Sequence, residues 1–126
     1  MALTAQQIFK IGAALIAERP NDDPDMVEFS PSYLNIILQE CLNAENSVRE
    51  AEGRELLRCA PFIESLEAEI DYSNHLTRVA IPYALAANFY RESGDNYHEQ
   101  QFRAEYVSAV NEAMVFSFKP IEDVYR

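Results

Sequence analysis

The chain contains no tryptophan and only two cysteines among its 126 residues, and the scarcity of cysteine already excludes two kinds of site. Cys41 and Cys59 are eighteen positions apart, without a second pair. This spacing fits neither a disulfide scaffold nor a zinc site made of two short cysteine pairs. Because free cysteine is among the most buried side chains, we expect two buried thiols in a reducing compartment.

Glycine is equally scarce, which removes the loops that enzymes build from it. The three glycines, Gly12, Gly53 and Gly94, stand where helix packing or helix termination explains them. The sequence has no phosphate-binding loop, dinucleotide fingerprint or nucleophile elbow. His75 and His98 are the only histidines, and neither has a histidine or cysteine four residues away, as a helical metal site would need. We therefore predict no catalytic residue, no metal site and no cofactor.

Basic residues are few. Ten lysines and arginines stand against 21 acids, a net charge of -11, whereas proteins that grip phosphates need the opposite sign. The acidic pairs Asp22/Asp23 and Glu67/Glu69 are interpreted as solvated surface, because unpaired carboxylates are costly to bury. The charge excess either keeps the protein soluble or lets a surface lie beside DNA without sticking to it.

Long apolar runs are also missing. No stretch of eighteen uncharged apolar residues is present, and the N-terminus has no cleavage-type small-residue site. The amphipathic segments carry acids on their polar faces, so an anionic bilayer would repel them. We expect a soluble, unexported protein without a membrane partner.

Helical periodicity dominates what remains. Thr4 and Gln7 form a capping-box pattern ahead of an apolar series that predicts a helix from about Ala5 to Glu18, in which Gly12 marks the close approach of another helix. Residues 19–29 hold two prolines and four acids and are predicted to form a loop. Ser30 and Pro31 are predicted to open a second helix that Gly53 ends, with a further turn through Cys59. Its buried stripe is Leu34, Ile37, Leu38, Cys41, Leu42 and Val48, and its polar face is Asn35, Gln39, Asn43, Asn46 and Glu50.

The second half predicts an arm followed by a helical hairpin. Residues 60–74 fit a short strand or a partial helix equally well, with Phe62, Leu66, Ile70 and Tyr72 as anchors. A third helix either kinks at Pro82 or starts there, and Gly94 ends it. The last helix, capped by Asp95 or Asn96, ends near Val115 or Phe116 because Pro120 opposes its continuation. Its inner face is Phe102, Tyr106, Ala109, Val110, Ala113 and Met114.

These elements predict an all-α fold, a small bundle of about four helices. Residues 1–115 form the bundle, with an irregular arm before the third helix, and residues 116–126 form an extended C-terminal tail. The tail is too apolar for inert disorder, so we expect another protein to bury it. The predicted interface residues are Phe116, Phe118, Pro120, Ile121, Val124 and Tyr125.

Residues 81–113 resemble a segment of small head-tail connector proteins of tailed bacteriophages. The sequence IPYALAANFYRESGDNYHEQQFRAEYVSAVNEA shares their pattern of a proline, a helix of small apolar residues, a short acidic break and an aromatic-punctuated helix, over about a quarter of the chain. In this family of adaptor, or head-completion, proteins a helical bundle forms a ring under the portal. The acidic loop 21–28 and the arm 60–74 depart from the family's usual pattern.

The resemblance implies a structural role in the virion neck. It implies a homo-oligomeric ring of twelve copies that contacts the portal protein and the next neck or tail protein, and that is made in the host cytoplasm. DNA would pass through the ring without specific binding, because an acidic lumen repels phosphates over roughly 10 Å. Family members commonly extend a C-terminal segment onto the portal or a neighbouring subunit, and residues 116–126 have the length and apolar spacing for this.

Two other interpretations stay open. One is a non-viral intracellular helical domain whose apolar tail binds a regulator. The other is a small enzyme or ligand-binding bundle with a pocket near Tyr83, Tyr90, Tyr106 and the two cysteines. The aromatic residues of that proposed pocket are more simply explained as core, so it ranks last.

Overall fold

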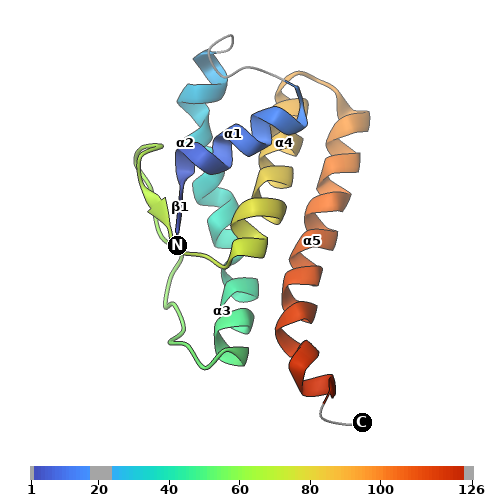
Figure 1. The fold of residues 1–126 in the computed structure, drawn as a ribbon. Helices are drawn as coiled ribbons and strands as arrows, with labels where there is room; N and C mark the ends of the chain where they lie inside the picture. The colour runs from blue at the N-terminus through green and yellow to red at the C-terminus, as the bar shows by residue number, and fades with distance from the viewer. Residues whose placement is uncertain (1, 18–23, 124–126) are drawn as a thin grey trace.

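The protein is a helical bundle with one irregular arm (Figure 1). The computed structural model describes residues 2–17 and 24–123, and their side chains as far as Val115. The described helices are α1 (Ala5–Leu15), α2 (Pro24–Glu40), α3 (Leu42–Ala51), α4 (Ile81–Glu92) and α5 (Asn96–Asp123), with a π-helical turn, η2 (Leu76–Ala80), before α4. Strands β1 (Leu3–Thr4) and β2 (Glu69–Ile70) pair antiparallel. The all-α prediction is confirmed, with five α-helices in place of about four.

Helix α1 begins as its sequence predicts. The Thr4 hydroxyl accepts a hydrogen bond from the Gln7 N–H, and the Gln7 side chain accepts one from the Thr4 N–H, which completes the capping box. Gly12 faces α4 closely, since a Cβ added there would lie 3.2 Å from the Cβ of Leu85, so its predicted role is confirmed. The helix ends at Leu15, earlier than predicted, where Ala17 takes a left-handed conformation with φ of 57°.

Helix α2 starts before its predicted cap. Pro24 opens the helix, so the predicted loop is wrong from this residue on, and residues 18–23 lie outside the described part. Ser30 and Pro31 lie inside α2, where the Ser30 hydroxyl donates to the Met26 carbonyl of the preceding turn. A proline removes one backbone hydrogen bond but need not end a helix whose apolar face stays buried. Cys41 forms a turn between α2 and α3, which divides the predicted second helix in two.

Gly53 ends α3 as predicted, with φ of 73°, and no helical turn follows it. Instead residues 54–73, which we call the arm, run back along α2 and α3 on the side away from α5 (Figure 1). Within the arm, β2 settles the open alternative in favour of a strand, although only two residues long. Ile70 and Tyr72 are buried anchors as predicted, whereas Phe62 is wrong as an anchor because it is 77% exposed.

The hairpin of α4 and α5 is the centre of the bundle. The chain is already helical at Asn74, ahead of Pro82, and Gly94 ends α4 with φ of 84°. Asp95 caps α5 by accepting a hydrogen bond from the His98 N–H at 3.1 Å. Helix α4 packs against α1, α2 and α5, so nearly every residue of its first two turns is buried. The small residues Ala84, Ala86 and Ala87 allow this close packing on several sides.

The predicted end of the last helix is wrong. Tyr106, Ala109 and Ala113 are buried on its inner face as predicted, but the backbone of α5 stays helical through Pro120 to Asp123. As in α2, the proline costs one hydrogen bond without ending the helix. The division into a bundle of residues 1–115 and an extended tail therefore does not describe the backbone, because residues 116–123 continue α5.

Candidate functional site

The predicted interface residues lie at and beyond the end of the described side chains. Phe116, Phe118, Pro120 and Ile121 belong to the last turns of α5, where only the backbone is described. Val124 and Tyr125 lie outside the described residues. Their contact with another protein stays a prediction.

Two asparagines hold the arm to the helices. The Asn46 side chain donates to the Leu57 carbonyl at 2.9 Å and accepts from the Leu57 N–H at 2.8 Å. Asn35 makes the same pair of bonds to Ile63, at 2.9 and 2.8 Å. At Leu57 and Ile63 each asparagine amide therefore binds the backbone N–H and carbonyl that a neighbouring strand would otherwise bind. We call Asn35 and Asn46 the clamp asparagines.

A buried ion pair holds both ends of the arm. The Arg49 Nε lies 2.7 Å from Glu45 Oε2, and the two side chains are 8% and 0% exposed. The Arg49 guanidinium also donates to the carbonyls of Glu55 and Asp71, at 3.2 and 2.7 Å. The second Glu45 oxygen accepts from the Ser73 N–H at 2.7 Å. The charges are therefore compensated by each other and by backbone groups, as buried charges must be.

The sequence patterns gave little sign of this network. The prediction placed Asn35 and Asn46 on the polar face of the helix without a partner, and both are half-buried under the arm. Glu45 and Arg49 stand four residues apart, the spacing of a helical ion pair, but such pairs usually lie on the surface. One feature of the sequence could have indicated the network. These polar residues stand next to the buried stripe of their helix, and the irregular segment that follows has backbone groups in need of partners.

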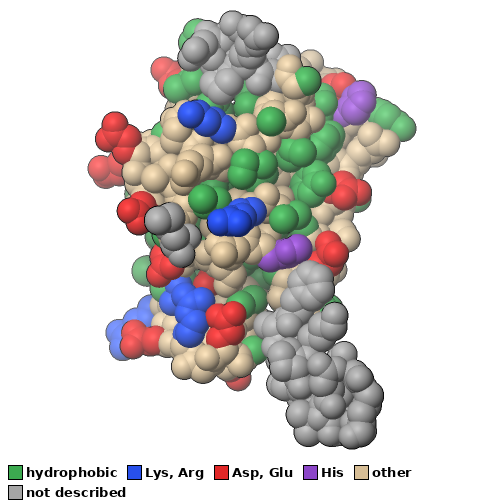
Figure 2. All heavy atoms as spheres, viewed as in Figure 1, with side chains coloured by type: hydrophobic (Ala, Val, Ile, Leu, Met, Phe, Trp, Pro, Cys, Tyr) green, Lys and Arg blue, Asp and Glu red, His purple; other side chains and the backbone are tan. Residues whose placement is uncertain are grey.

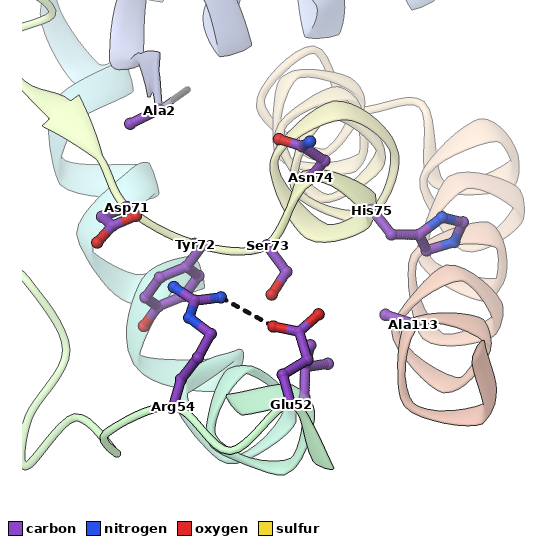
Figure 3. Close-up of a pocket in the computed structure, with 10 residues that line it drawn as sticks. Ala2, Glu52, Arg54, Asp71, Tyr72, Ser73, Asn74, His75 and Ala113 are labelled. Carbon is purple, nitrogen blue, oxygen red and sulfur yellow. Dashed lines mark hydrogen bonds and ion pairs between the residues drawn. The ribbon is translucent and has the colours of Figure 1, made fainter. Parts of the chain in front are cut away.

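A polar cavity of about 420 Å³ opens where the arm meets η2 (Figure 3). Arg54 and Glu52 form an ion pair of 3.1 Å at its mouth. The Ser73 hydroxyl points into the space between the arm and α3, and its oxygen is buried without a hydrogen-bond partner. The described lining residues are Ala2, Val48, Glu52, Arg54, Asp71, Tyr72, Ser73, Asn74, His75 and Ala113.

The chemistry available in this cavity is limited. A serine nucleophile needs a base within hydrogen-bond reach, and the Ser73 hydroxyl has none. Among residues 2–17 and 24–123, no three His, Cys, Asp or Glu side chains gather as a metal site requires. The cavity has room for water or a small polar molecule.

Only one of the two thiols is buried. Cys41 is fully buried in the core, whereas Cys59 is exposed on the arm, so the expectation of two buried thiols is wrong for Cys59. The Tyr106 hydroxyl donates to Glu40 Oε1 at 2.9 Å, which leaves its oxygen to accept the Cys41 thiol proton at 3.4 Å. Burial raises the pKa of Cys41 to about 11, so the thiol is protonated and inert at neutral pH.

Both histidines lie near the start of a helix. His98 Nδ1 lies 2.6 Å from Asp95 Oδ2, and its ring stacks on Tyr90 with centroids 5.0 Å apart. The hydrogen bonds from the His98 backbone and ring lower the pKa of Asp95. His98 is partly exposed, in line with its prediction as a surface residue, and it reinforces the cap of α5. His75 lies at the start of η2 and lines the polar cavity.

The three tyrosines of the predicted ligand pocket do not line one pocket. Tyr106 is in the core with Cys41, whereas Tyr83 and Tyr90 both pack against Phe102, with ring centroids 5.8 and 5.3 Å apart. Tyr83 lines a separate open hollow of about 550 Å³ between α1, α4 and α5. We call this the front hollow, and its described lining residues are Leu15, Tyr83, Gln101, Phe102, Ala104 and Glu105.

Comparisons with known proteins add no relative. No protein-family model, no curated protein and no solved structure matches the chain. Within residues 2–17 and 24–123, no helix has both the length and the apolar character needed to cross a bilayer. The likeness of residues 81–113 to phage connector proteins therefore stays a prediction from sequence.

Proposed function

We propose that this protein is a structural adaptor of a tailed-phage neck, which forms an oligomeric ring between the portal and the tail and performs no catalysis. The described side chains favour a scaffold over an enzyme. The buried charged pair Glu45 and Arg49 holds the arm, and the polar cavity offers no nucleophile paired with a base.

The observation that carries the proposal is the length of α5. Its 28 residues extend for about 42 Å, whereas the antiparallel partner segment from Leu76 to Glu92 extends for about 26 Å. Ala113 of α5 lies near His75, at the start of the partner segment (Figure 3). The turns of α5 after Ala113 therefore extend beyond the end of that segment. This projecting end carries the apolar residues that are proposed to dock.

The helical backbone changes the expected form of docking. An extended tail would add to a groove or a sheet edge, whereas a helix inserts an apolar face with anchors three or four residues apart. Phe118 and Ile121, and Phe116 and Pro120, have those spacings. We propose that these residues meet the portal or a neighbouring subunit. The net charge of -11 suits a ring around DNA, since acids repel phosphates.

The experiment is co-purification with the portal protein encoded in the same genome. The full chain is compared with a double variant, Phe118→Ser/Ile121→Ser, and with Val107→Ser as a control at an exposed apolar position of the same helix. We expect the full chain and the control to bind the portal, and the double variant to lose binding while keeping its helical circular dichroism. Absence of portal binding by the full chain, with capture of a cellular partner instead, would favour the non-viral interaction domain.

A further inference from the structure

The clamped arm displays two apolar side chains to water. Leu57 and Ile63 have both backbone groups bound by the clamp asparagines, and both turn inward, with Ile63 only 4% exposed. The residue before each points outward: Leu56 is 47% exposed and Phe62 is 77% exposed. Phe62 is the most exposed large apolar side chain of the described residues.

A phenylalanine presented in this way is suited to binding. Association costs free energy for every loop and side chain that it immobilises, so a contact residue on a fixed backbone loses less. Aromatic side chains also bury the most area per residue and serve as anchors at the centre of interfaces. Phe62, which we call the arm knob, is thus a preorganised and exposed apolar contact, whereas Leu56 lies further along the arm, beside the other clamp asparagine.

The front hollow offers a receiving surface. It is open, about 550 Å³ in volume, and its floor includes Leu15, Tyr83 and Phe102, all half-buried. Figure 2 shows hydrophobic side chains gathered over this face of α1, α4 and α5. The arm lies on the opposite side of the bundle from α5, so the knob of one molecule cannot reach its own hollow (Figure 1).

The charges around the two surfaces are complementary. On the arm, Glu64, Glu67 and Glu69 are exposed near Phe62, and Figure 2 shows acidic side chains along that edge. Figure 2 shows Lys and Arg side chains on the face where the hydrophobic side chains gather. Lys10 of α1 and Arg78 of η2 are exposed and form no ion pair with a described residue.

A charge in the lining of the hollow is also opposite to a charge on the arm. Glu105 lines the hollow, and the exposed Arg58 of the arm has the opposite charge. Opposite potentials steer the encounter of two surfaces and fix their register. In a chain of net charge -11, free cations beside an apolar hollow mark the face that an acidic strip can approach.

We propose that the arm knob of one copy docks into the front hollow of a second copy, with the acids of the arm facing Lys10 and Arg78. The contact joins two different surfaces, so it repeats from copy to copy and gives a ring or a filament. This inference rests on the proposed function in one respect, since it names the subunit contact of the proposed ring. One side chain buries well under the ~1,200 Å² of a stable interface, so each contact is weak and closure of the ring supplies the rest.

The test uses cross-linking with the knob intact. Wild-type chain, whose exposed thiol is Cys59, is mixed with a chain carrying Cys59→Ser and Gln101→Cys, and a short bismaleimide joins the two thiols. The matched control replaces Gln101→Cys by Asn43→Cys, an exposed position on α3. We expect about tenfold more mixed dimer with position 101 than with position 43, because docking raises the effective concentration of the two thiols.

Two further variants make the result specific. Phe62→Ser in the wild-type partner is expected to reduce the yield to the control level. Because Phe62 is 77% exposed, we expect the variant to fold as wild type does, which circular dichroism checks. Lys10→Glu/Arg78→Glu in the other partner is expected to lower the yield, and Glu64→Lys/Glu67→Lys on the arm is expected to restore it. Equal yields at positions 101 and 43, or a yield unchanged by Phe62→Ser, would overturn the inference.

The outcomes separate this inference from the proposed function. If the protein binds the portal but Phe62→Ser does not change the cross-linking yield, the subunits meet elsewhere. The inference then fails and the proposed function stands. If the cross-linking yield depends on Phe62 but the protein binds no portal, the inference stands and the proposed function fails.

Discussion

The bundle and the arm are held in place by different forces. In the bundle, α1, α4 and α5 interdigitate apolar side chains around residues such as Phe9 and Leu85, both fully buried. In the arm, side-chain amides and a buried ion pair bind backbone groups, and few apolar residues are buried. Apolar packing is diffuse, whereas each polar clamp acts at one point. Substitutions should therefore weaken the bundle as a whole and the arm locally.

The largest effect is expected where the two regions meet, at the buried pair of Glu45 and Arg49. Glu45→Leu removes the carboxylate that lies 2.7 Å from the buried guanidinium, and breaking a buried pair in this way typically costs 3–5 kcal/mol. We expect about 3 kcal/mol, at the lower end, because Arg49 keeps the carbonyls of Glu55 and Asp71 and a carboxylate oxygen of Asp71 at 3.6 Å. Urea denaturation measures the loss.

The control for this prediction removes both charges. Glu45→Leu/Arg49→Met replaces the pair by apolar groups, and such replacements are often neutral. We expect the double variant to recover most of the lost free energy of unfolding while leaving the arm loose. A double variant as unstable as the single one would show that the lost bonds to the backbone of Glu55, Asp71 and Ser73, and not the unpaired charge, cause the loss.

The next effect is expected in the arm alone. Asn46→Ala removes two hydrogen bonds of about 1 kcal/mol each and leaves the backbone groups of Leu57 without their partner. We expect hydrogen exchange at the Leu57 amide to accelerate by roughly 30-fold, as about 2 kcal/mol implies, with little change at the amides of α4.

Asn43→Ala is the matched control, because Asn43 is exposed on the same helix, and it should leave that exchange rate unchanged. Acceleration across α4 as well would mean that the arm and the bundle unfold together.

The same contrast explains what sequence patterns could predict. Helical periodicity located the bundle, because burial of one face repeats every three or four residues: Tyr106, Ala109 and Ala113 were predicted from spacing alone and are buried. Local chemistry was equally informative at Thr4, Gly53 and Gly94, where caps and left-handed turns need particular residues.

The arm was not predictable in this way. Its position depends on Asn35 and Asn46, which reach backbone groups 28 and 11 residues away, and no short-range pattern encodes such pairs. The prolines misled the prediction for the opposite reason. Local rules treat Pro31 and Pro120 as helix boundaries, but the helices continue through both.

A smaller effect follows from the pKa of Cys41, within the bundle. Its folded-state pKa of about 11 lies above the ordinary 9.0, so the folded chain holds the proton to higher pH than the unfolded chain. Stability is unaffected below pH 9 and falls as the pH rises from 9 to 11. At pH 10 the loss is about 1.4 kcal/mol, and it is absent in Cys41→Ala.

The measurement is urea denaturation of both chains at pH 8 and pH 10. Burial also raises the pKa values of Tyr72 and Tyr106, which adds a loss of the same sign at high pH in both chains. The difference between the chains therefore reports the thiol. Equal pH dependence in the two chains would show that the thiol ionises in the native protein as readily as in the unfolded one.

The smallest effect is expected at Thr4, which belongs to both regions. Its hydroxyl caps α1, its backbone pairs with Glu69 in the two-stranded ribbon, and the adjacent Ala5 N–H donates to the Ala68 carbonyl of the arm. Thr4→Ala removes only the hydroxyl, so we expect a loss of about 1 kcal/mol in the free energy of unfolding. Thr4→Ser keeps the oxygen and should stay within a few tenths of wild type. Since the backbone bonds to the arm survive, exchange at Leu57 should not change, and an acceleration there would show that the cap of α1 also holds the arm.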